Sequence, residues 1–538
     1  MPENPFWEKE TLFVIILISI CLLLYFFRLG TMPMGDSDEA MHASTSKDMV
    51  LSGDWVTPRY NAENFYDKTP LYNWLAAISF LLFGFSEFAA RLPAALLGLG
   101  CVMITYWLAR CMFGLLVAFL SALVLATSAE FIVLSRAVVH DISLAFFVTL
   151  ALTLFFVGYK NEKHRKPAFL FGYAALGFAV LAKGPVGAVL PMMIIGLFLI
   201  CNRQLRFLRE MQIGWGLLIF LAIAAPWYIL ISLRNPDYIG YFFLKQNIGS
   251  FLSQESRHPR PFYYYIPILM GGLFPWSLFL PLALYRAIRA KAALHGDGVI
   301  FALIWFGVIF IFFSIASSKL GTYILPLFPA AAMLVGVLWY DLLYASNRIL
   351  HKWVFLSYLP FAAIMPLALV YVLLFPPGSL TADTGITLSL VNFFVVWIVG
   401  CAFISIGLVT KKKYKAFIGS IVGMTATLFL LVLIYIAPLL GPLVSTKELA
   451  LKLDRLMEPG KSIKFFHKAR ASFLFYTDRT GKLLKNPQQL MDYMDSGKKA
   501  YCVIKYDDWE DIENLHGALR VVAKVGDTLI ISNKKTDH

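Results

Sequence analysis

The segment TLFVIILISICLLLYFFRLGTMPMGDSDEA, residues 11–40, joins a 17-residue apolar run to three carboxylates within four positions. The run is long enough to cross the hydrocarbon core of a bilayer. Asp36, Asp38 and Glu39 follow it at the membrane edge, where a carboxylate is costly unless it is solvated, paired or used in a reaction. The segment therefore predicts a membrane protein with a polar site beside its first span.

The composition of the whole chain supports this class. Of its 538 residues, 59% are hydrophobic and 15% are charged, and the mean hydropathy is +0.70. These values are typical of a polytopic membrane protein and exclude an ordinary soluble domain. The net charge of +14 comes from short basic clusters between apolar runs, which indicate topology. The sequence has no basic pattern with interleaved aromatic residues, so it does not predict a nucleic-acid partner.

Thirteen apolar runs have the length needed to span a bilayer, about 17 to 25 residues. The run 71–84 has only 14 residues, and we interpret it as re-entrant or interfacial. Five basic loops then fall on one side of the membrane, which places the N-terminus in the cytoplasm and the C-terminus outside. The thirteen runs lie near residues 11–27, 91–110, 113–131, 139–158, 167–182, 184–201, 213–233, 264–284, 299–316, 321–345, 353–375, 387–409 and 416–438.

The C-terminal segment differs in character from the rest of the chain. We expect residues 1–440 to form the transmembrane domain, and residues 441–538, which are charged and mixed, to form a small α/β domain on the outer side. Helical patterns alternate there with short apolar stretches. The helical patterns lie near 446–457, 487–494 and 507–515, and the apolar stretches are SIKFF, AYCVIKY, LRVVAKV and TLIIS.

Charged residues on the predicted outer side occur in two long loops, 28–90 and 234–263, and in shorter turns that carry Asp141, Lys183 and Lys319. If the helices bring these edges together, the residues form one polar cavity at the lipid boundary. Helices that lie along the outer membrane surface complete this expected architecture.

Each candidate residue also has a structural interpretation. The acidic pattern that ends at Glu39 resembles a capping box that opens a helix over 37–51, in which Asp38 is not needed. Asp141 has two structural interpretations, as an acid at a helix start or as the partner of Arg136, and one functional interpretation, as a group that acts in a reaction. Lys68 either binds a ligand or extends its ammonium to the membrane interface.

Five sequence blocks resemble bacterial GT-C glycosyltransferases related to protein O-mannosyltransferases, especially the undecaprenyl phosphate aminoarabinose transferases that modify lipid A. The blocks follow one another over residues 30–335, and the thirteen-span plan with an outer C-terminal domain fits the same family. The blocks are the loop that begins DSDEAMHAST, then SRAVVHDISL, LAKGPVGAVLP, RHPRPFYYYIPILMGGLFPW and SSKLGTYILPLFPA.

The resemblance implies a GT-C fold and an inverting transfer of a sugar from a polyprenyl phosphate, with no nucleotide cofactor. Asp38 matches the acid at the active centre of the family, and Asp141 matches a second acid. Lys68 matches the lysine that holds the carrier phosphate. Further contacts with the donor or substrate are expected from Lys183, Arg257, Lys319, Tyr323 and Glu39.

The same resemblance raises the question of a divalent metal ion. Asp67 stands at the position of an acidic metal ligand, and Asn247 aligns where aminoarabinose members carry a metal-binding histidine. Asparagine is a poor ligand for zinc, although its carbonyl oxygen suits a harder cation. Met41 and His42 also stand where the family has arginine and tyrosine. The metal and the sugar are therefore both left open.

These observations lead to one hypothesis and two alternatives. The chain is expected to be a glycosyltransferase of the bacterial inner membrane, with its active site and C-terminal domain in the periplasm. It would move a sugar from undecaprenyl phosphate to lipid A or another lipopolysaccharide component, and the first candidate for the sugar is 4-amino-4-deoxy-L-arabinose. A hexose transferase acting on protein or glycan hydroxyls is the enzyme alternative. A lipid-linked sugar transporter or flippase is disfavoured, because the charges lie at one membrane face and the sequence shows no internal repeat.

Overall fold

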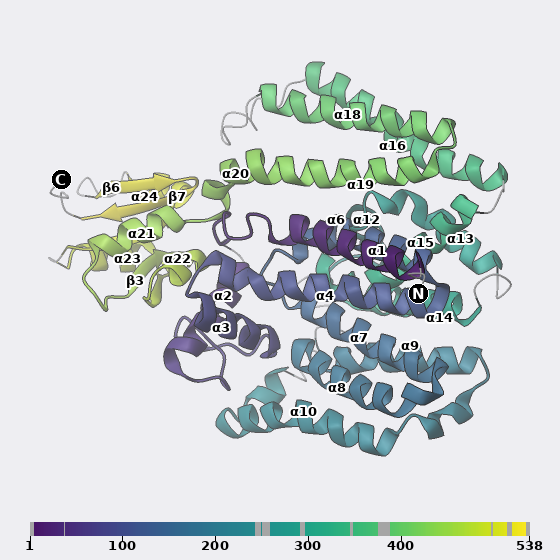
Figure 1. Ribbon diagram of the computed structural model, residues 1–538. Coiled ribbons are helices and arrows are strands. Elements are labelled where there is room, and N and C mark those ends of the chain that lie inside the picture. Colours follow the sequence, from purple (N-terminus) through teal and green to yellow (C-terminus); the bar gives the residue numbers. More distant parts are fainter. Residues whose placement is uncertain are drawn as a thin grey trace.

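The computed structural model describes residues 5–36, 38–242, 249, 259–290, 296–344, 348–374, 388–496, 499–513 and 519–533. Within these residues the chain forms a bundle of apolar helices, with a small sheet beside one end of the bundle (Figure 1). Eight of the described helices are long and apolar enough to cross a membrane, or nine if one bent pair counts as a single span. The chain is thus a multi-pass membrane protein.

Most of the bundle consists of these apolar helices, several of which continue through a short 3-10 or π-helical segment. The bent pair joins Phe262–Gly272 to Trp276–Arg289 at an angle of 115°. The helices are α1 (Pro5–Cys21) with η1 (Leu22–Phe26), α4 (Glu87–Phe113), α5 (Leu115–Ala126), α7 (Asp141–Lys160), α8 (Arg165–Lys183), α9 (Val186–Cys201), α10 (Ile213–Arg234), η5 (Phe262–Tyr264) with α12 (Tyr265–Gly272), η6 (Trp276–Phe279) with α13 (Leu280–Ala290), α14 (Gly296–Ile315), η7 (Gly321–Leu327) with α15 (Phe328–Tyr344), α16 (Arg348–Leu374), α18 (Leu388–Thr410), and α19 (Tyr414–Leu431) with η8 (Val432–Ile436) and α20 (Ala437–Val444).

Eight of the thirteen predicted runs therefore coincide with helices that are long and apolar enough to span. The other five coincide with helices that do not meet this requirement as single helices. Helix α5 has 12 residues and is about 18 Å long, which is shorter than a hydrocarbon core of about 30 Å. The other four are α8, α9, α16 and the bent pair. Hydropathy thus located the apolar segments, and the number that cross the membrane stays a prediction.

Small residues set the spacing at the centre of the bundle. Helix α5 packs between α4 and α15, and nine of its 12 residues are buried. A Cβ added at Gly336 of α15 would overlap Ser121 of α5, and one at Gly98 of α4 would overlap Ser135. Close backbone approach of this kind stabilises helix contacts in membranes. This packing fixes the end of α5, and the next helix in the chain, Ala129–Leu134, lines the polar site.

The loop after α1 contains two helices and a small hairpin. Helix α2 (Asp38–Ser52) agrees with the predicted helix over 37–51. It is followed by β1 (Arg59–Tyr60), β2 (Glu63–Asn64) and α3 (Leu71–Phe83). Helix α3 buries one face, whereas Leu81 and Leu82 are exposed on the other. Short 3-10 segments η2 (Glu162–His164) and η3 (Leu205–Glu210) join longer helices.

The C-terminal segment folds around a five-stranded mixed sheet with helices, where the sequence predicted a small α/β domain with four apolar stretches. The strand order is β4-β3-β5-β7-β6, with parallel pairs β3–β4 and β3–β5 and antiparallel pairs β5–β7 and β6–β7. Two elements were not predicted, the edge strand β4 and the six-residue helix α22. The elements are α21 (Lys447–Leu456), β3 (Ile463–Phe466), α22 (Ala471–Tyr476), β4 (Gly481–Leu484), α23 (Pro487–Met494), β5 (Tyr501–Lys505), α24 (Tyr506–Glu513), β6 (Arg520–Val525) and β7 (Thr528–Ser532).

Helix α22 connects this domain to the membrane bundle by packing on α2 (Figure 1). Lys47 of α2 donates to the carbonyl oxygen of Phe475 at 2.9 Å and pairs with Asp478 at 2.8 Å. Asp36 accepts from the backbone N–H of Ser472 at 2.9 Å. Asp36 therefore has a structural role, but it anchors the C-terminal domain and does not cap α2.

Candidate functional site

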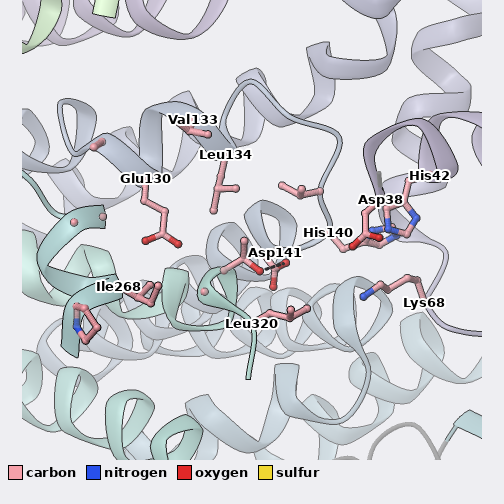
Figure 2. Close-up of a pocket in the computed structure, with 17 residues that line it drawn as sticks. Asp38, His42, Lys68, Glu130, Val133, Leu134, His140, Asp141, Ile268 and Leu320 are labelled. Carbon is pink, nitrogen blue, oxygen red and sulfur yellow. Dashed lines mark hydrogen bonds between the residues drawn. The ribbon is translucent and has the colours of Figure 1, made fainter. Parts of the chain in front are cut away.

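A cavity of ≈580 Å³ lies where α2 and the loop before α3 meet the bundle (Figure 2). Its walls come from segments far apart in the sequence: the start of α2, the loop before α3, the helix α6 (Ala129–Leu134), the residues at the start of α7, the end of α12 and the start of η7. The polar side chains that line it are Asp38, His42, Lys68, Glu130, His140, Asp141 and Thr322. The predicted meeting of polar edges thus occurs for part of the candidate set.

Asp38 and Lys68 stand at one end of the cavity (Figure 2). Asp38 is the first residue of α2 and is exposed, and Lys68 is half-buried in the loop that precedes α3. Neither side chain makes a hydrogen bond or an ion pair with any residue that the structure describes. A carboxylate and an ammonium group are therefore both available to a ligand in the cavity.

Asp141 faces the same cavity but is already paired. It begins α7, its side chain is 12% exposed, and it forms an ion pair with Lys183 at the end of α8. Thr322 also donates to it at 2.9 Å, and the Lys183 Nζ lies 3.8 Å from the centroid of the Tyr323 ring. These contacts hold the carboxylate in one orientation.

Arg136, the other partner considered for Asp141, lies elsewhere. Its guanidinium donates to the carbonyl oxygen of Leu24 at 3.0 Å and stacks over the ring of Phe429. The partner of Asp141 is 42 residues away in sequence, so no local pattern could have identified it.

Glu39 organises the backbone around the site. Its carboxylate accepts two hydrogen bonds from the buried guanidinium of Arg91, at 2.8 and 2.9 Å. It also accepts from the backbone N–H groups of Gly35 and Val138. Glu39 thus joins the start of α2 to α4 and to the loop that leads to Asp141, which makes it a positioning residue in this structure.

Two buried histidines were not among the candidates from sequence. The rings of His42 and His140 lie 4.4 Å apart, between centroids, beside Asp38 and Lys68 (Figure 2). Burial, and then the nearby His140 and Lys68, lower the pKa of His42 well below its usual range, although Asp141 opposes this. His42 is therefore neutral near pH 7. The available signals were the position of His42 four residues after Asp38, which is about one helical turn, and that of His140 directly before Asp141.

The remaining candidates lie outside this cavity or outside the described residues. Lys319 is buried and donates to the carbonyl oxygens of Arg260 and Ala316, beside a second cavity. Asp67 accepts a hydrogen bond from Tyr241. Arg257 and Asn247 fall on residues that the structure does not describe.

The metal proposal rests on Asp67 and Asn247, and only the first is described. In the described part of the chain, no group of three His, Cys, Asp or Glu residues is arranged to hold a metal ion. The described residues therefore do not form a metal-binding set.

Comparison with known proteins connects this geometry to a family. Residues 67–230 match the family described as dolichyl-phosphate-mannose-protein mannosyltransferase. The chain is 31% identical to an uncharacterized protein of Aquifex aeolicus over 71% of this chain and 74% of that one. It is 32% identical to undecaprenyl phosphate-alpha-4-amino-4-deoxy-L-arabinose arabinosyl transferase 2 of Proteus mirabilis, over 60% of this chain and 58% of that one. The match thus spans under two thirds of that transferase.

Among solved structures, the chain resembles ArnT from Cupriavidus metallidurans bound to undecaprenyl phosphate, with a TM-score of 0.79, 24% identity, and coverage of 97% and 98% of the two chains. An archaeal oligosaccharyltransferase from Archaeoglobus fulgidus gives a TM-score of 0.53 at 14% identity, over 93% of this chain and 70% of that one. These likenesses define the class: a polytopic membrane protein with an ArnT-like fold.

The sequence relatives indicate the family within that class. Residues 67–230 match the mannosyltransferase family, and the named arabinosyl transferases are relatives over about 60% of the chain. Enzymes of this family use lipid-phosphate sugar donors in place of nucleotide sugars.

Proposed function

We propose that this protein transfers a sugar, with inversion, from undecaprenyl phosphate to lipid A or another lipopolysaccharide component at the periplasmic face of the inner membrane. The first candidate for the sugar is 4-amino-4-deoxy-L-arabinose, because several relatives at about 30% identity carry that activity in their names. The observation that carries the proposal is that a carboxylate, Asp38, and an ammonium, Lys68, share one cavity and that neither pairs with a described residue.

The proposed reaction is a direct displacement at the anomeric carbon. An acceptor oxygen forms the new glycosidic bond while the bond from that carbon to the donor phosphate breaks. The electron pair of the broken bond goes to the phosphate oxygen, and undecaprenyl phosphate leaves. Lys68 neutralises the charge that grows on this oxygen, so it stabilises the transition state more than the bound donor.

Asp38 is assigned to the acceptor side of the reaction. When the acceptor is a hydroxyl group, its proton passes to the Asp38 carboxylate as the oxygen attacks. When the acceptor is a phosphate, the nucleophile is already anionic near neutral pH, and Asp38 then orients the donor sugar and stabilises positive charge on its ring. The exposure of Asp38 suits contact with an incoming acceptor.

Asp141 and Lys183 are assigned a different task. Because Lys183 is bound to Asp141 and stacked on Tyr323, it is not free to follow a leaving phosphate. We infer that the pair fixes the wall of the cavity on which the sugar rests. Contacts of Arg257, Lys319 and Tyr323 with the donor, and a metal at Asp67 and Asn247, remain proposals from the family resemblance.

The second candidate function is transfer of a hexose to a hydroxyl group of a protein or glycan. The unpaired state of Asp38 favours it, since a hydroxyl nucleophile needs a base and a phosphate does not. The two candidates differ only in sugar and acceptor, and both use the same cavity.

We also propose thirteen membrane crossings, with the 28–90 and 234–263 loops and the 441–538 domain on the periplasmic side. The packing of α22 on α2 supports a common side for the loop and the domain. Single cysteines at the exposed positions Ser52 and Lys482, in a background without native cysteines, should both react with an impermeant reagent. Reaction at one position alone, with both reacting after detergent treatment, would contradict the topology.

The proposed function is tested by comparing lipid A and surface glycans from wild-type and deletion strains by mass spectrometry. Loss of one sugar from lipid A is expected, and its return on expression of the wild type but not of Asp38→Asn would assign it to this enzyme. Loss of a hexose from a protein or glycan would favour the second candidate. Unchanged lipid A and glycans would contradict both.

A further inference from the structure

Glu130 stands in the wall of the same cavity, away from the end that holds Asp38 and Lys68. It belongs to α6, the short helix between α5 and the residues leading to α7. Figure 2 shows its carboxyl group on one side of the cavity and Asp38 and Lys68 on the other, with Asp141 between them. A ligand whose phosphate is held by Lys68 would extend past Asp141 toward Glu130.

The carboxyl group of Glu130 has no partner in the part of the chain that the structure describes. Its Oε2 atom is shielded from solvent and makes no hydrogen bond with a described residue, and none of the described Lys or Arg residues forms an ion pair with it. The neighbouring wall is apolar and includes Val133, Leu134 and Ile268. An unpaired carboxyl group in such a place costs free energy, and a partner supplied by a ligand would recover it.

The surrounding backbone makes room for this carboxyl group. A Cβ added at Gly272, at the end of α12, would overlap Glu130 Oε2. An acid that only stabilised the first turn of α6 would do so equally well from the solvent. The absence of a side chain at Gly272 and the position of Glu130 on the cavity wall therefore indicate a group built to face a ligand.

The charges in the cavity indicate which ligand group Glu130 would bind. The ammonium of Lys183 already neutralises Asp141, and Lys68 lies toward the other end, where the donor phosphate is proposed to bind. Glu130 thus lacks a cation, and a protonated amino group supplies one: it donates a hydrogen bond and also brings a positive charge, whereas a hydroxyl group donates the hydrogen bond without the charge.

We propose that Glu130 is a specificity-determining residue that recognises a protonated amino group on the donor sugar, on the side of the ring away from the anomeric carbon. The inference rests on the proposed function and goes beyond it, because it assigns the choice between an amino sugar and a neutral sugar to one side chain. A neutral hexose donor could give this carboxylate a hydrogen bond but no counter-charge.

The test uses the purified full-length protein, lipid A as acceptor, and two undecaprenyl phosphate donors. One donor carries 4-amino-4-deoxy-L-arabinose, and the other carries L-arabinose, which has a hydroxyl group in place of the amino group. The wild type should prefer the amino donor in kcat/KM by about 10- to 100-fold, the range expected for one hydrogen bond to a charged group. Glu130→Gln should lose most of this preference, with less than about a threefold change for arabinose. Glu162→Gln, which removes an exposed carboxylate far from the cavity, should retain it.

Three results distinguish the possible failures. An equal loss of activity with both donors in Glu130→Gln, together with a lower midpoint of thermal unfolding, would mean that Glu130 is structural and would overturn the inference. Wild-type preference that survives in Glu130→Gln would also overturn it. A wild type that neither binds nor transfers either sugar would overturn the proposed function itself. If Glu130→Gln does not fold, Glu130→Asp, which shortens the reach of the carboxylate, should still reduce the preference.

Discussion

Asp38, Lys68 and Asp141 line one cavity, and Lys183 lies behind its wall as the partner of Asp141, so two pairs of oppositely charged side chains can be compared. Asp141 and Lys183 bind each other, with Thr322 and the ring of Tyr323 as further partners. Asp38 and Lys68 line the same space without a partner in the described chain. A buried ion pair fixes geometry, because separating it leaves an unpaired charge. Unpaired groups at an open cavity are free to act on a ligand, so the two pairs are expected to respond differently to mutation.

The largest expected effect is on the stability of the paired side. Asp141→Asn leaves the ammonium of Lys183 without its anion, in a place where the two side chains are 12% and 14% exposed. The free energy of unfolding should fall by about 3–5 kcal/mol. The midpoint of thermal unfolding in detergent measures this change. The double variant Asp141→Asn with Lys183→Met should recover much of the loss, and no recovery would contradict the pairing argument.

The next effect concerns the unpaired carboxylate and appears in the rate. Asp38→Asn keeps the size of the side chain and removes its charge, so turnover should fall by about 10²-fold or more while the unfolding midpoint is unchanged. Single-turnover transfer with the true donor is the appropriate measurement. Near-normal transfer would move the catalytic role to Asp141 and remove the contrast between the two pairs.

Substitution of the unpaired ammonium should have a somewhat smaller effect. Lys68→Gln should lower the maximal rate and weaken donor binding together, by about tenfold or more, because Lys68 is proposed to contact the phosphate before and during bond cleavage. Lys68→Arg should retain only part of the activity. It keeps the positive charge, but the guanidinium fork differs in shape from an ammonium group. If Lys68 only anchors the loop at the interface, both variants would match the wild type at subsaturating donor.

The smallest effect concerns the histidine beside the unpaired side chains. Burial lowers the pKa of His42 below its ordinary value of 6.5, so at acid pH the unfolded chain binds a proton that the folded chain does not. Stability is then fully present above about pH 6.5 and is lost as the pH falls. The expected loss is about 1.4 kcal/mol one pH unit lower. Unfolding midpoints between pH 7.5 and 5.5 should show it, and His42→Gln should show less of it.

The membrane helices could be located from sequence better than they could be counted. Apolar runs are visible because a bilayer requires them, whatever the neighbouring helices are. The 115° bend between Phe262–Gly272 and Trp276–Arg289, and the short α5 inside the bundle, depend on packing against other helices. The bend and the short helix therefore cannot be predicted from one apolar run alone.

The C-terminal domain shows the same division. Strands β3, β5, β6 and β7 were anticipated from their apolar residues, whereas the edge strand β4 has the sequence GKLL and lies partly exposed. Helix α22 was missed because six residues give too little periodicity to identify a helix. It is nevertheless the element that joins the domain to α2, through Lys47 and Asp36.

The sequence by itself determined that this protein is a multi-pass membrane protein with a small mixed C-terminal domain, and it identified Asp38, Lys68 and Asp141 as candidates. Tertiary structure alone decided which charges are paired. Lys183 reaches Asp141 from another helix, Arg91 binds Glu39 across 52 residues, and no described residue pairs with Asp38, Lys68 or Glu130. The physical reason is that hydropathy is a property of neighbouring residues, whereas electrostatic energy depends on distance in space and on burial.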